Sequence, residues 1–253
     1  MWGCGRTPIS SPSTCPGASA AFPGYEGGGV TVGKRRTRPA GRRRQIRPGS
    51  VPPKEPLFFC AEGQTEERYV RALVQYRYGG LFVPQPLGPR SRRPGRETSL
   101  KNLIDHARNE ETGWRRSERG KTIWIVCDAD ANELHRDALE RWLDEENHRC
   151  AMQAVSIEAW LLQHFADATR PLTAGEAFSR LQKQWPEYVK GRDIPKWLIE
   201  RTDEACKRER DFLRGVANAG AWPVERSSQL PALIAYLDER KRKLDERKRE
   251  LQR

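Results

Sequence analysis

The segment that decides the fold reads Thr122-Ile-Trp-Ile-Val-Cys-Asp-Ala-Asp-Ala-Asn132. A short, continuous apolar run that ends in polar residues is typical of a strand buried on both faces of a parallel sheet. We therefore predict a strand over residues 122–127, followed by a turn that carries Asp128 and Asp130. A helix is expected next, over residues 133–147, with a buried face made of Leu134, Ala138, Leu139, Trp142 and Leu143.

The same alternation of strand and helix occurs on both sides of this segment. Further strands are expected at residues 57–61, 81–83 and 151–155, and further helices at residues 65–78, 98–116 and 157–165. Alternating elements of this kind predict an α/β fold with a mainly parallel sheet and flanking helices. The remaining sequence reads as a helical C-terminal region, with breaks at Pro186, Pro195 and Pro223.

Composition divides the chain of 253 residues into three parts. Residues 1–54 are rich in Gly, Pro and Ser and contain ten Lys or Arg residues but only one acid, so we expect a disordered basic tail. Residues 55–170 form the predicted α/β domain, and residues 171–253 form a helical extension packed on it. Most of the formal net charge of +12 thus belongs to the tail.

Two arginine-rich segments are candidate nucleic-acid contacts. In the tail they are Arg42, Arg43 and Arg44, and in a Pro-rich loop after the second strand they are Arg90, Arg92 and Arg93. Such arginines neutralise backbone phosphates of DNA or RNA. Solvated surface charge is the alternative interpretation of both segments, and for the tail a leader from an over-extended start codon is another.

Several classes of protein are excluded or disfavoured by composition. No apolar run approaches the roughly 18 residues of a membrane span, and the N-terminus lacks the pattern of a secretory signal, so we expect a cytoplasmic protein. The six cysteines form no Cys-x-x-Cys pair, which favours free thiols over a disulfide or zinc framework. His164, in an apolar helical stretch, is expected to be a hydrogen-bonded core residue.

Carboxylates follow two of the predicted strands. Glu62 ends the strand over residues 57–61, and Asp128 and Asp130 end the strand over residues 122–127. Side chains beyond the carboxyl ends of parallel strands share one crevice, so these groups can converge. A cluster of oxygen ligands without Cys or His selects Mg²⁺ or Mn²⁺, which can bridge phosphate oxygens. In this hypothesis the Asp pair holds the ion, and Glu62 is a catalytic acid or base or binds a second ion.

A purely structural interpretation of these residues stays open. Asp130 or Asn132 can cap the next helix, and Glu62 can be limited to hydrogen bonds within the turn. The Asp-x-Asp spacing alone does not decide between the two interpretations.

The chain resembles a known family. The strand followed by Glu62-Gly63-Gln64-Thr65-Glu66 and the strand followed by Asp128-Ala129-Asp130 resemble the Toprim fold of topoisomerases, primases and several nucleases. More specifically, Ser156-Ile-Glu-Ala-Trp-Leu-Leu-Gln-His-Phe165 and Tyr188-Val-Lys-Gly191 resemble the RloB-like family, whose members are encoded near restriction-modification genes or beside ATPases of phage-defence systems.

The resemblance implies a function and a set of site residues. Glu62 matches the acidic turn of the family, Asp128 and Asp130 match its metal-binding pair, and Glu158 matches a helix-borne Glu that completes a metal shell or pairs with an Arg. The implied activity is that of a Mg²⁺- or Mn²⁺-dependent nuclease in abortive infection, with DNA or RNA as substrate and an ATPase as partner. The alternatives are a non-catalytic module that binds nucleic acid or a partner protein and, more weakly, a primase-type nucleotidyl transferase.

Overall fold

The computed structural model describes residues 54–88, 99–129, 132–165, 170–171, 173–214 and 221–251. These residues belong to one compact unit that spans Val51–Arg253. Several predictions concern residues outside the described ranges. They are residues 1–53 of the predicted disordered tail, the arginines Arg42, Arg43, Arg44, Arg90, Arg92 and Arg93, and the second aspartate of the Asp pair, Asp130.

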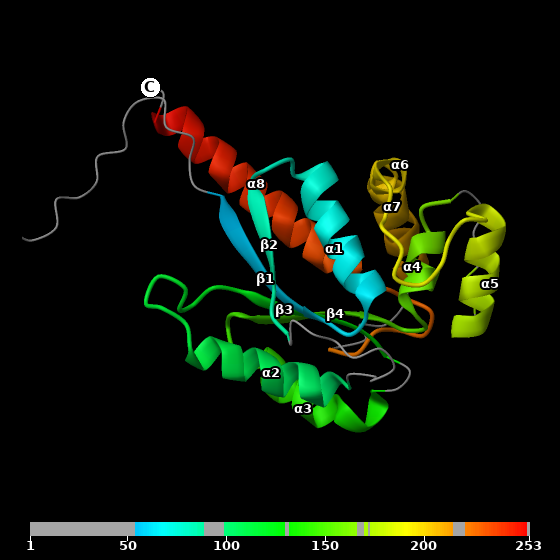
Figure 1. Cartoon of the computed structure of the whole chain (residues 1–253), viewed down its shortest axis with the longest axis horizontal. Coiled ribbons are helices and arrows are strands. Elements are labelled where there is room, and N and C mark those ends of the chain that lie inside the picture. Colours follow the sequence, from blue (N-terminus) through cyan, green and yellow to red (C-terminus); the bar gives the residue numbers. More distant parts are fainter. Residues whose placement is uncertain are drawn as a thin grey trace, which may run out of the picture. The chain divides into compact units, whose positions relative to one another are not determined.

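Four parallel strands form the sheet at the centre of the molecule (Figure 1). In chain order they are β1 (Glu55–Ala61), β2 (Phe82–Pro86), β3 (Ile123–Asp128) and β4 (His148–Gln153), and their order in the sheet is β2-β1-β3-β4. Each neighbouring pair is parallel. The predicted α/β class and its parallel sheet are therefore confirmed, and each of the four expected strands is present.

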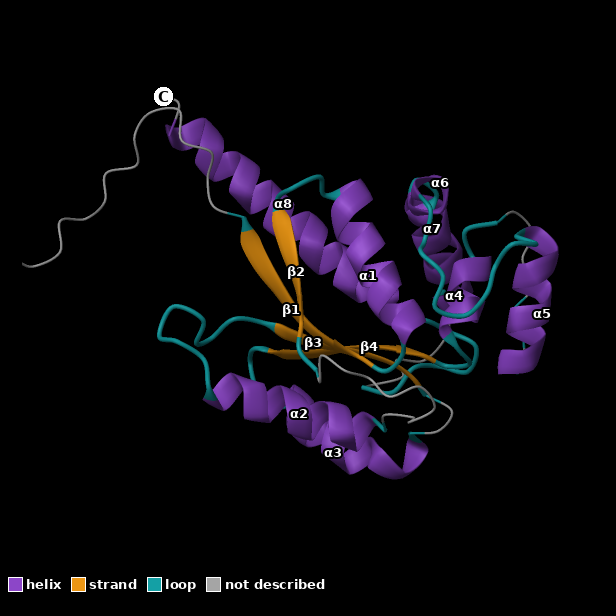
Figure 2. Ribbon diagram, viewed as in Figure 1, coloured by secondary structure: helices purple, strands orange, loops and turns teal. Residues whose placement is uncertain are grey.

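Helices cover both faces of this sheet (Figure 2). α2 (Leu100–Thr112) and α3 (Arg136–Leu143) lie on one face, whereas α1 (Gln64–Arg77) and α8 (Leu230–Leu251) lie on the other. The helices between β4 and α8 contribute to the same core as α1; they are α4 (Ile157–Leu162), α5 (Ala174–Gln184), α6 (Lys196–Ile199) and α7 (Thr202–Leu213). Among the described residues, no helix combines the length and apolar character that a bilayer span requires.

A hydrophobic core lies on each face of the sheet. The apolar strands contribute side chains to both cores, because successive side chains of a strand point to opposite faces. In β3, Trp124 and Val126 pack with α1 and α8, whereas Ile123, Ile125 and Cys127 pack with α2 and α3. This explains why the strand lacks the polar alternation of a half-exposed sheet. The described cysteines Cys60, Cys127, Cys150 and Cys206 are free thiols, as expected.

The helix expected over residues 133–147 is shorter and differently phased. Residues Glu133–His135 form a 3-10 turn, η1, and the α-helix begins only at Arg136. A 3-10 turn has about three residues per turn, so a residue within it loses the phase of the following helical stripe. Leu134 is accordingly 96% exposed, and its predicted burial is wrong. Leu139 and Trp142 are buried as predicted.

The C-terminal region is helical between breaks at the predicted prolines. α5 ends before Pro186, Pro195 is the N-cap of α6, and Pro223 lies between α7 and α8. The first two turns of α8 pack into the core through Leu230, Leu233, Ile234 and Leu237, and the charged remainder of the helix extends past the sheet.

His164 is a buried core residue, as the sequence predicted. Its Nδ1 lies 3.2 Å from the carbonyl oxygen of Trp160, and its Nε2 lies 3.5 Å from the hydroxyl of Tyr69. Burial lowers the pKa of His164 from 6.5 to about 4. The folded protein therefore holds this ring in its neutral form at neutral pH.

The depressed pKa of His164 predicts a loss of stability in mild acid. Between pH 6.5 and about 4 the unfolded chain binds a proton that the folded chain does not bind, so the free energy of unfolding falls as the pH drops through this window. The contribution of His164 to this loss is about 3 kcal/mol below pH 4. We expect His164→Phe to flatten the pH dependence of urea denaturation between pH 6.5 and 4.5, and His135→Gln to leave it as in the wild type. Equal slopes for His164→Phe and the wild type would contradict the prediction.

A buried ion pair joins Glu209 of α7 to Arg170, which lies between α4 and α5. A guanidinium nitrogen of Arg170 lies 2.8 Å from Oε2 of Glu209, while Oε1 of Glu209 accepts a hydrogen bond of 2.8 Å from the backbone N–H of Ser228. Only 1% of the Glu209 side chain is exposed. Burial raises the pKa of Glu209, and the charge of Arg170 opposes this effect.

Removing one partner of this ion pair should be costly. We expect Glu209→Ala to lower the free energy of unfolding by about 3–5 kcal/mol, because Arg170 is left charged and buried without its partner. The matched control is Glu204→Ala, since Glu204 pairs with Arg208 on the same helix but is 67% exposed, and a change below about 1 kcal/mol is expected there. Urea denaturation of both variants measures the difference. Similar losses in both variants would refute the role of burial.

Candidate functional site

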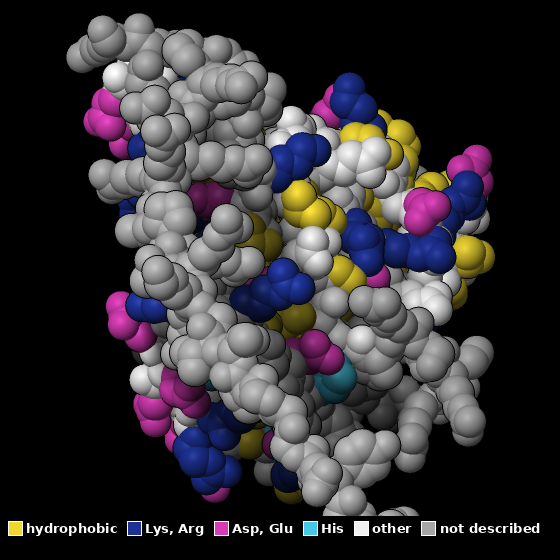
Figure 3. Space-filling view, turned by 60° about the vertical axis from the view of Figure 1, so that its left-hand side comes forward, with side chains coloured by type: hydrophobic (Ala, Val, Ile, Leu, Met, Phe, Trp, Pro, Cys, Tyr) yellow, Lys and Arg dark blue, Asp and Glu magenta, His cyan; other side chains and the backbone are white. Residues whose placement is uncertain are grey.

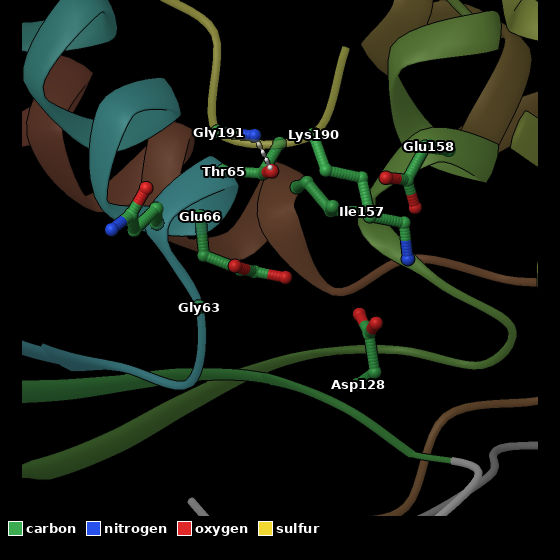
Figure 4. A pocket seen from close by; sticks show the side chains of 9 residues that line it. Gly63, Thr65, Glu66, Asp128, Ile157, Glu158, Lys190 and Gly191 are labelled. Carbon is green, nitrogen blue, oxygen red and sulfur yellow. Dashed lines mark hydrogen bonds between the residues drawn. The ribbon is translucent and has the colours of Figure 1, made fainter. Parts of the chain in front are cut away.

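A pocket of about 230 Å³ opens at the carboxyl edge of the sheet (Figure 4). Four parts of the chain form it: the turn from β1 into α1, the end of β3, the start of α4, and the loop between α5 and α6. Its lining residues are Gly63, Gln64, Thr65, Glu66, Asp128, Ile157, Glu158, Lys190 and Gly191. The position agrees with the general placement of ligand sites beyond the carboxyl ends of parallel strands.

The turn from β1 into α1 places a carboxylate in this pocket. Gly63 is the N-cap of α1, and Glu66 lies in the first turn of the helix with only 5% of its surface exposed. A Cβ atom on Gly63 would lie 2.4 Å from Oε2 of Glu66. The glycine therefore leaves room for the Glu66 carboxylate to fold back over the start of α1, where the helix dipole favours negative charge.

The end of β3 supplies the second carboxylate, and Glu62 lies against it. The backbone N–H of Glu62 continues the pairing of β1 with β3 by donating to the carbonyl of Val126 at 2.9 Å. In return, Oε2 of Glu62 accepts a hydrogen bond of 2.9 Å from the backbone N–H of Asp128. The structure thus brings Glu62 and Asp128 together, as the sequence predicted, but Glu62 is not among the residues that line the pocket.

Asn132 holds the turn that follows β3. Its side-chain amide donates to the carbonyl oxygen of Asp128 at 2.8 Å, and its Oδ1 accepts a hydrogen bond of 2.7 Å from the backbone N–H of Leu100, the first residue of α2. The side chain therefore caps α2, which precedes it in the chain, and not the following helix that the structural alternative named. This fixes the backbone on which Asp128 is carried.

Glu158 supplies the third carboxylate from the first turn of α4. It is 2% exposed, and Oε1 accepts a hydrogen bond of 2.9 Å from the hydroxyl of Tyr188. Burial, together with the charge of Glu158, raises the pKa of Tyr188, so that the phenol stays protonated and remains a donor. The partner that the structure gives to Glu158 is thus a tyrosine and not the arginine of the alternative interpretation.

The loop between α5 and α6 closes the remaining side of the pocket. The backbone N–H of Gly191 donates to Oγ1 of Thr65 at 2.9 Å, and this bond ties the loop to the start of α1 (Figure 4). Lys190 precedes this anchor, and its ammonium group points toward the carboxylates of Glu158 and Asp128. The pocket therefore combines three carboxylates with one cationic side chain at its mouth.

The side-chain atoms at the pocket that could ligate a metal ion are oxygens. Cys127, the thiol next to Asp128 in sequence, belongs to the core on the opposite face of the sheet. A hydrogen bond with Cys150, burial, and the nearby charges of Glu62 and Asp128 raise the pKa of the Cys127 thiol. It is therefore a neutral thiol and not a thiolate ligand.

Sequence reasoning found part of this site. It identified Asp128 and Glu158, which line the pocket, and Glu62, which bonds to Asp128. It quoted Glu66 and Lys190 only as parts of family motifs and assigned neither to the site. Glu66 lies in the first turn of α1. This position was the available signal, because α1 begins just beyond the carboxyl end of β1, where ligand sites of parallel sheets lie.

A second group of potential ligands lies at the opposite edge of the sheet. Among the described residues, Glu111, Glu145 and His148 are the group of three whose ligand atoms all lie within 4.8 Å of one another. His148 begins β4, pairs in register with Ile123, and has Nε2 3.0 Å from Oε2 of Glu111. The pocket carboxylates do not approach one another this closely, so an ion among them would keep part of its water shell.

Comparison with known proteins gives one positive finding. The family model described as RloB-like protein matches residues 57–237, a range that includes every residue of the pocket. Comparison with curated proteins and with solved structures gave no significant match. Because the family model covers more than half of the chain and the pocket residues lie within it, this protein belongs to the RloB-like family.

Proposed function

We propose that this RloB-like protein is a divalent-metal-dependent nuclease that cleaves phosphodiester bonds of DNA or RNA. The observation that carries the proposal is the pocket itself, in which the carboxylates of Glu66, Asp128 and Glu158 come from three separate elements and face one space (Figure 4). Carboxylates gathered in this way repel one another, and a cation relieves that repulsion. The pocket is therefore suited to a positively charged ligand.

The donor set fits Mg²⁺ or Mn²⁺. Both ions prefer oxygen ligands, and Mg²⁺ retains several waters when proteins bind it through one or two carboxylates. The three pocket carboxylates do not form a group as tight as that of Glu111, Glu145 and His148, which suits this partly hydrated mode of binding. We assign Asp128 and Glu66 as direct ligands and Glu158, oriented by Tyr188, as the third acidic group of the site.

In the proposed chemistry, the ion and the protein side chains have separate roles. A bound ion would screen the charge of a phosphodiester and lower the pKa of a coordinated water. Glu66 faces the pocket and can accept a proton there. Glu62, through its hydrogen bond to the Asp128 backbone, holds that ligand in place and remains our proposed acid–base group or ligand of a second ion.

The size of the pocket restricts what it can recognise. A volume of about 230 Å³ is below the roughly 300–1,000 Å³ of pockets that enclose drug-sized ligands. A phosphate group with its ion fits within such a space, and the attached sugar and base lie outside. Within the pocket, the proposed enzyme thus contacts the phosphate backbone and not a base. Family membership extends the proposal to defence against invading genomes, with an ATPase as partner.

Loss of the Asp128 charge should abolish both ion binding and cleavage. We expect Asp128→Asn to bind Mn²⁺ at least tenfold more weakly in titration calorimetry and to lose cleavage of labelled single- and double-stranded DNA and RNA. The matched control is Asp137→Asn on α3, an exposed acid outside the pocket. A thermal melt of each variant establishes that the fold is intact.

The outcomes separate the two main hypotheses. Cleavage that survives in Asp128→Asn would overturn the nuclease assignment. Wild-type protein that binds labelled oligonucleotides but shows no Mn²⁺ binding would favour the non-catalytic module over the enzyme. Equal losses in Asp128→Asn and Asp137→Asn would show a general charge effect and would also count against the site.

A further inference from the structure

The loop that carries Lys190 is anchored on both sides of this residue. On the N-terminal side, Tyr188 is fully buried, donates its hydroxyl to Glu158, and accepts a hydrogen bond of 3.2 Å from the Gln182 side chain at its carbonyl oxygen. Lys190 follows two residues later. The backbone at Lys190 therefore cannot move far without breaking buried contacts.

On the C-terminal side, Gly191 provides the second anchor. Its N–H bonds to Thr65, and its φ of +71° is a left-handed conformation that favours glycine. A Cβ atom there would lie 2.8 Å from Oε1 of Gln64, so the loop approaches the start of α1 closely. Together the two anchors hold Lys190 over the pocket.

The Lys190 side chain is exposed and crosses the mouth of the pocket (Figure 4). Its ammonium group points toward Glu158 and Asp128. Because the side chain is exposed, its charge is accessible to a ligand that enters from solvent. A lysine ammonium is a flexible point charge with three donors, and it is a common ligand of phosphate oxygens.

The charge of Lys190 lies among carboxylates at the pocket. On the face seen in Figure 3, the described Lys and Arg side chains (dark blue) are interspersed with Asp and Glu side chains (magenta). Three carboxylates at the pocket would also repel an approaching phosphodiester. A cation at the mouth offsets that repulsion at the point where the substrate enters.

We propose that Lys190 binds a backbone phosphate of the nucleic acid at the mouth of the pocket. The inference rests on the proposed nuclease function and deepens it, because it assigns the residue that holds the substrate beside the ion. In this role Lys190 is a substrate ligand, distinct from Asp128, Glu66 and Glu158, which hold the cation. Thr65 and Gly191 act as positioning residues that keep the lysine in place.

The test measures how binding of an oligonucleotide depends on salt. The probes are fluorescent 12-residue oligothymidylate and oligouridylate, titrated with the full-length protein in Ca²⁺ over a series of KCl concentrations. For Lys190→Met we expect about tenfold weaker binding at low salt, the loss of one charge-assisted contact. The slope of log affinity against log salt should fall by about 0.7, the value for one phosphate contact on a single strand.

Two further variants serve as references. Lys190→Arg keeps the charge and should keep the slope, whereas Lys207→Met removes an exposed lysine of α7 and should change neither quantity. Unchanged affinity and slope in Lys190→Met would overturn the proposal, and so would equal losses in Lys190→Met and Lys207→Met.

Titration with Mn²⁺ alone distinguishes this inference from the function on which it rests. We expect Lys190→Met to bind Mn²⁺ at least as tightly as the wild type, because a competing positive charge has been removed from the pocket. Normal Mn²⁺ binding with an unchanged salt slope would refute the role of Lys190 and leave the metal site intact. Absence of Mn²⁺ binding by the wild type would overturn the proposed function itself.

Discussion

The parallel pairing of β1 with β3 is the constraint on which the candidate site depends. Ala61 lies opposite Val126, and the register continues beyond β1 because the Glu62 backbone donates to Val126 and the Glu62 carboxylate accepts from Asp128. A shift of one residue would turn Asp128 to the face of α2 and α3, since the side-chain period of a strand is two. The hydrogen bonds at the carboxyl ends of β1 and β3 therefore fix both the β1–α1 turn and the last residue of β3. The start of α4 and the lysine-bearing loop are then placed around them.

The pocket brings negative charges together, and the fold compensates each charge differently. Glu66 lies at the start of a 14-residue helix, where the backbone dipole favours an anion. Glu158 is buried but accepts a hydrogen bond from the hydroxyl of Tyr188. Asp128 is the last residue of β3 and the least buried of the three. These arrangements reduce the repulsion without removing it, as the proposed cation site requires.

Much of this architecture could be predicted from the sequence because the strands are continuous apolar runs with clear ends. The positions of Asp128 and Glu158 followed from such ends and from the family motif, and the burial of His164 followed from its apolar surroundings. The predicted burial of Leu134 was wrong because a 3-10 turn changes the helical phase, and no local sequence pattern predicts that turn. Lys190 was missed as a site residue for a different reason. Its proximity to Asp128 arises from long-range contacts, between Thr65 and Gly191 and between Glu158 and Tyr188, that spacing along the chain does not encode. Glu66 was also not assigned to the site, although its place in the first turn after β1 was a usable signal.

The position of α8 makes the first strand depend on a segment far along the chain. The first two turns of this helix complete the core that also contains Leu57, at the beginning of the sheet, and one guanidinium nitrogen of Arg240 lies 2.8 and 2.7 Å from the two carboxylate oxygens of Glu55. Contacts between parts of a chain so distant in sequence form late in folding. A chain that lacks α8 therefore exposes the apolar face of its sheet that Leu230, Leu233 and Leu237 cover.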